Sequence, residues 1–210
     1  MRILQVVHAF FPENTGGTET QTLLLSQALR ARGHSVTVFY RVFAPDLPEH
    51  TIIPGEYEGL STYRIVNNYT GQPPAPFAYQ NPGVETRFLE VLGRVEPELV
   101  HFQHLGDLSI SLLPAAQTQG LPAVLTLHDF WHLCFRSHLV TGDGQLCTGP
   151  EGGLCCLDCY LKQQHETFAL ASVRARTIEL GPRHALCQLP RFARNWLATQ
   201  FATVAPRSRV

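Results

Sequence analysis

The chain has 210 residues, of which 44% are hydrophobic and 16% charged, and its formal net charge at pH 7 is −1. This length suits one α/β domain, or one domain with a sizeable insertion, and it can bury a core without disulfide staples. The small net charge and the lack of any run of like charges argue against a nucleic-acid-binding protein. No window approaches the roughly 20 consecutive apolar residues of a membrane-spanning helix.

The N-terminal sequence MRILQVVHAFF begins directly as a β-strand. A secretory signal would need a longer apolar stretch followed by a small-residue cleavage site. We therefore expect a cytoplasmic protein. In that compartment the six cysteines are expected to be thiols or metal ligands rather than disulfides.

The first part of the chain predicts a parallel strand–helix–strand unit. Strands are expected at residues 3–7 and 35–40, on either side of a helix from Thr18 to Arg32. Thr18 is a candidate N-cap, and Gly33 stands where a C′ glycine belongs. The apolar residues of this helix recur at helical spacing and predict one buried stripe: Leu24, Leu25, Ala28 and Leu29.

The remainder continues the alternation of strands and helices, which predicts a Rossmann-like, doubly wound parallel sheet with a Cys-containing insertion. Residues 44–59 are expected to form a surface excursion and residues 67–82 a long, functional loop. The other expected elements are strands at 62–66, 99–102, 123–127 and 185–189, and helices at 84–95, 108–119, 165–180 and 191–201. Ligands of such sheets bind beyond the carboxyl ends of the strands, which singles out the loops 8–18, 67–82, 103–107 and 128–136.

A glycine pair, Gly16 and Gly17, lies at the start of the first helix. Two glycines there allow backbone N–H groups to approach a ligand closely, and the helix dipole favours an anion. A turn that merely begins the helix is an equally good interpretation. The spacing is not G-x-G-x-x-G, and Tyr40 and Arg41 stand where an acidic residue would be needed, so a nicotinamide dinucleotide site is disfavoured.

Two predicted strands are followed by histidines, His104 and His128, and either ring could donate to a phosphate or a sugar hydroxyl. One such histidine is more often structural. Two at equivalent strand ends, opposite a glycine loop, favour a polar or anionic ligand. Asp107 and Asp129 could bind hydroxyls or act as a base, and Asp129 could equally cap a turn.

Five of the six cysteines lie within residues 134–159. Cys156 and Cys159 form a C-x-x-C pair, and Cys134 and Cys147 would complete a four-thiolate structural zinc site. Zinc is the first interpretation, reduced surface thiols the second and disulfides the third. A four-thiolate site has no open position, so no metal role in catalysis is expected.

Several segments, in their order and spacing, resemble glycosyltransferase family 4, and the resemblance spans essentially the whole chain. The C-x-x-C pair further resembles a subgroup with a cysteine-bearing insertion. The segments are Pro12 with Gly16–Glu19, Arg32–His34 with Val36–Val38, residues 97–104, residues 125–131, Cys134–Arg136 and Cys147–Pro150.

The resemblance implies that residues 1–210 are the N-terminal, acceptor-side half of a GT-B glycosyltransferase, with the Cys-rich insertion at residues 130–164. It implies retaining transfer of a sugar from a nucleoside-diphosphate sugar to an acceptor glycan or a lipid-linked sugar, with no cofactor required for catalysis. Gly16 and Gly17 match the loop that approaches the donor phosphates. His128 matches the family's catalytic histidine, while His104 and Arg136 match positions near the cleft. We add Asp129, beside His128, as a candidate for substrate binding.

The sequence also departs from the family pattern. Leu189–Arg191 stands where the family shows a serine, and the chain stops at Val210, where the interdomain linker is expected to begin. The C-terminal donor-binding domain, with its E-x7-E motif, is therefore expected to be absent. We expect a chain inactive alone, completed by a C-terminal domain for which a separate chain is a candidate, with peripheral association at the inner face of the membrane. The alternative is a degenerate, non-catalytic domain that binds a glycan or a protein partner.

Overall fold

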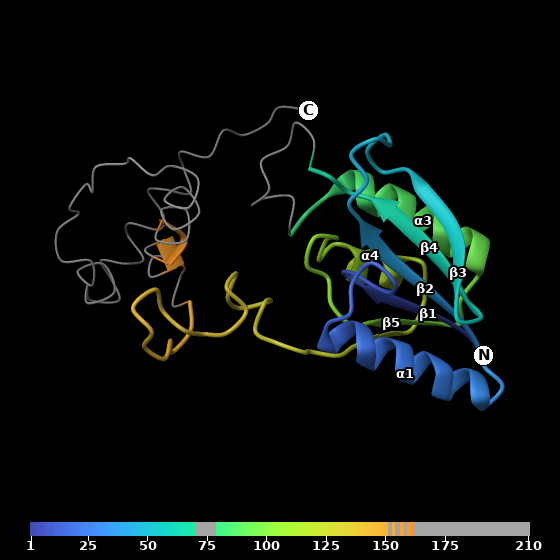
Figure 1. Cartoon of the computed structure of the whole chain (residues 1–210), viewed down its shortest axis with the longest axis horizontal. Coiled ribbons are helices and arrows are strands. Elements are labelled where there is room, and N and C mark those ends of the chain that lie inside the picture. The colour runs from blue at the N-terminus through green and yellow to red at the C-terminus, as the bar shows by residue number, and fades with distance from the viewer. Residues whose placement is uncertain (70–78, 151–152, 154–155, 158, 162–210) are drawn as a thin grey trace. The chain divides into compact units, whose positions relative to one another are not determined.

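The computed structural model describes residues 1–69, 79–150, 153, 156–157 and 159–161 (Figure 1). The chain divides into two compact units, residues 1–128 and residues 129–210. The helices predicted at 165–180 and 191–201 and the strand predicted at 185–189 lie outside the described residues.

The first unit is built on a six-stranded sheet with the order β3-β4-β2-β1-β5-β6 (Figure 1). All neighbouring pairs are parallel except β3–β4. The chain builds outward from β1 to one side and then returns to add β5 and β6 on the other, which gives a Rossmann-like α/β arrangement. The strands are β1 (Arg2–Val7), β2 (Ser35–Val42), β3 (Ile52–Tyr57), β4 (Leu60–Val66), β5 (Leu99–Phe102) and β6 (Ala123–Leu125).

Among the described residues, three helices accompany the sheet: α1 (Gly17–Ala31), α3 (Pro82–Val95) and α4 (Leu112–Thr118). Side chains alternate between the two faces of a strand, so each face has its own core. Val36 and Val38 of β2 pack in one cluster with Leu23 of α1. Phe39, which points the other way, contacts Phe88 of α3 at a ring-centroid distance of 5.6 Å. The sheet is therefore covered by α1 on one face and by α3 on the other.

The buried face of α1 differs from the prediction. Leu24 is 60% exposed, whereas the buried residues of the helix are Glu19, Thr22, Leu23 and Ser26. Thr22 can face the core because its Oγ1 donates to the carbonyl of Thr18, at 2.7 Å, which satisfies the hydroxyl within the helix. The predicted stripe was therefore wrong for Leu24 and Ala28, which are exposed, whereas Leu29 packs against the core as predicted.

The ends of α1 were predicted in part. Gly16, not Thr18, is the N-cap residue, and no side chain caps the helix. Gly33 was placed correctly: it adopts φ +86° and donates its N–H to Arg30 O at 2.8 Å.

The excursion predicted at residues 44–59 contains the strand β3. Pro54 and Gly55 lower the strand propensity of this segment. Pro54 is tolerated because β3 is an edge strand that pairs only with β4, opposite Tyr63. The helix predicted at 108–119 begins later, at Leu112, because residues 105–108 form a turn in which Asp107 adopts φ +56°.

The second unit opens with a turn in which Cys134 N–H donates to Phe130 O at 2.7 Å. A short hairpin follows, marked by the bridge between Val140 and Leu146. Residues 156–157 and 159–161 are helical. In the part of the chain that the structure describes, no helix has the length and apolar character needed to cross a membrane.

Candidate functional site

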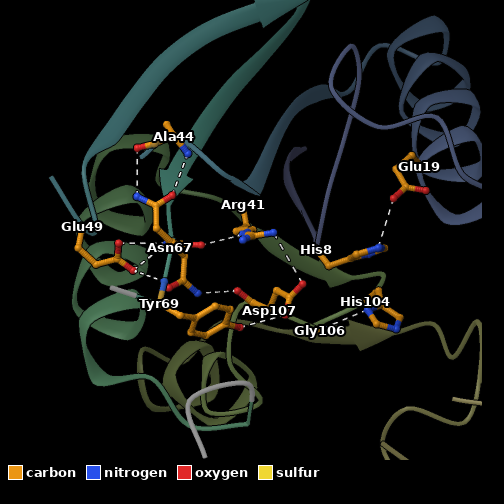
Figure 2. A network of polar contacts seen from close by, with 11 residues as sticks. His8, Glu19, Arg41, Ala44, Glu49, Asn67, Tyr69, His104, Gly106 and Asp107 are labelled. Atoms are coloured by element: carbon orange, nitrogen blue, oxygen red, sulfur yellow. Dashed lines mark hydrogen bonds and ion pairs between the residues drawn. The ribbon is translucent and has the colours of Figure 1, made fainter. Parts of the chain in front are cut away.

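The carboxyl ends of β1 and β5 bring two histidines into contact beside the start of α1. His8 directly follows β1 and His104 follows β5, and their ring centroids are 4.4 Å apart. His8 Nε2 lies 3.2 Å from Glu19 Oε1 in the first turn of α1 (Figure 2). His8 therefore connects the glycine turn with His104.

The carboxylate of Glu19 lies against Gly16. A Cβ atom at position 16 would stand 2.5 Å from Glu19 Oε2, whereas at position 17 nothing lies within 4 Å. The Glu19 side chain is only 6% exposed, and its charge is stabilised by the dipole of α1. Glu19 thus already places an anion beside the glycine turn, which the sequence interpretation did not foresee.

An open hollow of about 770 Å³ runs along the first two turns of α1. It is lined by the glycine turn and by the outer face of the helix, including the exposed Leu24. The glycine pair therefore borders open space on one side and the Glu19–His8 contact on the other.

His104 is buried, with 8% of its surface exposed. Its Nδ1 accepts a hydrogen bond from the backbone N–H of Gly106 at 3.0 Å (Figure 2). In the neutral ring the proton is then on Nε2, since the two nitrogens of a neutral imidazole are one donor and one acceptor. Nε2 of His104 is thus a donor, the type of group that a phosphate oxygen requires.

His128 follows β6 and is held at the end of β5. Its Nε2 lies 2.9 Å from Oε1 of Gln103, the residue immediately before His104. The structure therefore brings three of the predicted elements, the glycine turn, His104 and His128, to the carboxyl edge of neighbouring strands. His8, Glu19 and Gln103 join them, although sequence reasoning gave these three no role.

A second polar cluster follows β2 and β4 (Figure 2). Arg41 Nη1 lies 3.8 Å from Asp107 Oδ2, and Arg41 Nε donates to Asn67 O at 2.9 Å. Tyr69 donates its hydroxyl to Asp107 Oδ1 at 3.0 Å. Burial raises the pKa of Tyr69, and the negative charge of Asp107 raises it further, so the phenol stays protonated. This cluster links two of the predicted ligand loops, 67–82 and 103–107.

Glu49 anchors the same cluster and was also missed. Its carboxylate accepts from the backbone N–H groups of Asn68 and Tyr69, at 2.9 Å and 3.0 Å. The sequence indicates this cluster only through the position of its residues, which lie near the ends of predicted strands.

The remaining predicted residues, Asp129 and Arg136, belong to the second unit. Asp129 Oδ1 accepts from the backbone N–H of Trp131 at 2.8 Å, which is the turn-capping role weighed as its alternative. Arg136 Nη1 is buried and has no hydrogen-bond partner among the described residues.

The four predicted zinc ligands, Cys134, Cys147, Cys156 and Cys159, are all partly buried free thiols. Burial raises the pKa of Cys156, and the charges of Cys147, Cys134 and Cys159 raise it further. In the described residues, however, no three His, Cys, Asp or Glu side chains are arranged to hold a metal ion. The zinc site stays a prediction.

Comparison with known proteins gives one family. The sequence profile of Glycosyltransferase Family 4 matches residues 15–146, more than half of the chain. No curated protein matches the sequence of this chain.

Among solved structures, the chain is similar to three structures of two synthases, and it spans less than two thirds of each of those chains. Sucrose-phosphate synthase from Thermosynechococcus elongatus shares 20% identity over 48% of this chain and 26% of that chain, with a TM-score of 0.35. The catalytic domain of starch synthase IV from Arabidopsis thaliana, bound to ADP and acarbose, shares 18% identity over 59% of this chain and 32% of that chain, with a TM-score of 0.36. A further structure of the Thermosynechococcus elongatus enzyme shares 17% identity over 60% of this chain and 62% of that chain, with a TM-score of 0.37.

Proposed function

Because the chain belongs to glycosyltransferase family 4, we propose that it is the N-terminal, acceptor-side half of a retaining GT-B enzyme. The donor is a nucleoside-diphosphate sugar, and the acceptor is a glycan or a lipid-linked sugar. The observation that carries the proposal is the meeting of the glycine turn and His104 through His8, at one edge of the sheet.

The donor phosphates are proposed to approach Gly16, Gly17 and His104. A helix N-terminus offers unpaired backbone N–H groups and a favourable dipole to an anion, and the His104 ring, whose Nδ1 accepts from Gly106, is proposed to add a donor on Nε2. Glu19 opposes this arrangement by its charge. Its contact with His8 Nε2, at 3.2 Å, offsets part of that repulsion whenever His8 is protonated.

The acceptor is proposed to bind near Arg41, Asp107 and Tyr69. Asp107 and Arg41 have side chains that are 49% and 22% exposed, so both can reach a ligand. A carboxylate accepts from sugar hydroxyls and a guanidinium donates to them. The aromatic ring of Tyr69 lies beside them and can cover a sugar face.

His128 is proposed to contact the transferred sugar. The family resemblance assigns it this role, and its bond to Gln103 holds the ring at the carboxyl edge of β5. A C-terminal domain is proposed to supply the basic residues and the E-x7-E motif that bind most of the donor. Turnover by these 210 residues alone is therefore not expected.

Isothermal titration of the chain with UDP, GDP and ADP tests the donor side, and a sugar-transfer assay after addition of a C-terminal donor-binding domain tests the reaction. His128→Ala is expected to lower kcat by at least about 100-fold, the lower end of the range for a lost proton-transfer or charge-stabilising group. His34→Ala is the matched control, because His34 precedes β2 at the opposite edge and bonds to the N-terminal amine.

Binding of a nucleoside diphosphate with transfer by the completed enzyme would support the proposal. Glycan or protein binding without any turnover after completion would instead favour the non-catalytic alternative.

A further inference from the structure

Two glutamines are buried in the sheet where apolar side chains would normally pack. Gln5 lies in the middle of β1 and Gln103 directly after β5, and both are fully buried. A buried amide costs stability unless it is hydrogen-bonded. The two are bonded to each other: Gln103 Nε2 donates to Gln5 Oε1 at 3.0 Å. A chain of hydrogen bonds therefore runs from His128 through Gln103 to Gln5 inside the sheet.

The contacts of Gln103 fix the direction of its amide. Its Nε2 faces Gln5 Oε1 and also lies 3.3 Å from the ring nitrogens of His101. Burial lowers the pKa of His101 and the charge of His128 lowers it further, so His101 is neutral and has a nitrogen that accepts. With its NH₂ group directed at these acceptors, Gln103 presents Oε1 to His128 Nε2 at 2.9 Å.

The side-chain nitrogen of Gln5 shows that this orientation lowers the stability of the fold. Gln5 Nε2 is buried and has no hydrogen-bond partner among the described residues. An unpaired buried donor is destabilising, and two apolar residues would avoid it. The pair therefore orients Gln103 at the expense of core stability.

We propose that Gln103, held by Gln5, is a positioning residue for His128: it fixes the ring and keeps the proton of the neutral imidazole on Nε2. Nδ1 is then the acceptor atom of that ring. This inference rests on the proposed function, in which His128 contacts the transferred sugar. A sugar hydroxyl that reaches the His128 ring would then donate to Nδ1 rather than accept from it.

Histidine tautomers are measured directly by long-range ¹H–¹⁵N correlation spectra of the ¹⁵N-labelled chain. At a pH where His128 is neutral, its Nε2 is expected to be protonated. Gln103→Leu keeps a similar volume and removes the acceptor, so the His128 signals should move toward a mixture of tautomers. Gln103→Glu replaces the acceptor by a carboxylate and should raise the pKa of His128 by about one to three units. Gln117→Leu is the control, because Gln117 is exposed at the end of α4.

Two results would overturn the inference: an Nδ1-protonated His128 in the unchanged chain, or a tautomer that Gln103→Leu leaves unaltered in a folded protein. The transfer assay separates this from the proposed function. If the tautomer responds as expected and the completed enzyme transfers no sugar, the positioning holds and the glycosyltransferase proposal fails. If both hold, Gln103→Leu should lower kcat on the order of 100-fold with little change in KM.

Discussion

Replacing Gly16 with alanine should destabilise the protein through Glu19. The backbone of Gly16, at φ −76°, is one that alanine adopts, so the cost comes from the new Cβ and from the lower preference of alanine for the N-cap position. That atom would stand 2.5 Å from Glu19 Oε2. The carboxylate then has to leave a site where Glu19 is 5% exposed and its Oε1 lies 3.2 Å from His8 Nε2.

The size of the effect follows from two opposing contributions. A lost hydrogen bond to a charged group costs about 1.5–3 kcal/mol. Alanine lowers the conformational entropy of the unfolded chain, which stabilises the folded protein by about 0.4–1 kcal/mol. The free energy of unfolding should therefore fall by about 0.5–2.5 kcal/mol. Gly17→Ala is the matched control, since a Cβ there meets no atom within 4 Å and should stabilise the helix by about 0.5–1 kcal/mol.

Urea unfolding followed by circular dichroism measures both variants. A second substitution, Glu19→Ala, should remove most of the penalty of Gly16→Ala, because no carboxylate is left to displace and only the N-cap preference remains. The reasoning would be refuted if Gly16→Ala proved as stable as Gly17→Ala, or if its full penalty persisted without Glu19.

Three further predictions concern other parts of the chain. The lowered pKa of His101 means that the unfolded chain takes up the proton first as the pH falls. The protein should therefore lose stability below about pH 6.5, and thermal melts should show a shallower decline for His101→Gln; equal slopes would count against the assignment. Asn81 caps α3 by accepting from Gly83 N–H and Val84 N–H, so Asn81→Ala should cost about 1–2 kcal/mol in urea unfolding; an unchanged midpoint would contradict the capping role. Metal analysis of the purified chain should find one zinc bound by the four cysteines, and less than about half an equivalent would argue against that site.

The sheet could be predicted from the sequence because its parallel strands are short apolar runs separated by helices. The positions of His104, His128 and the glycine turn followed from that order, since parallel strands end at the same edge. The strand β3 could not be predicted, because Pro54 and Gly55 have low strand propensity and only edge pairing makes them acceptable.

Polar residues inside the fold account for the other misses. No pattern in the sequence indicates a role for Gln5 or Gln103. Only the three-dimensional pairing of β1 with β5 shows that they bond to each other and that Gln103 bonds to His128. Likewise, spacing cannot show that α1 turns Thr22 inward and leaves Leu24 exposed. Both cases depend on long-range contacts that override local pattern.

Chemical-shift mapping with a nucleoside diphosphate tests most directly whether the glycine turn and the two imidazoles form one donor-facing edge. Amide signals of Gly16, Gly17, His104 and His128 in the ¹⁵N-labelled chain should move together and saturate at a common concentration. Shifts confined to other residues, or no shift even when the C-terminal domain is present, would contradict the donor site proposed at this edge.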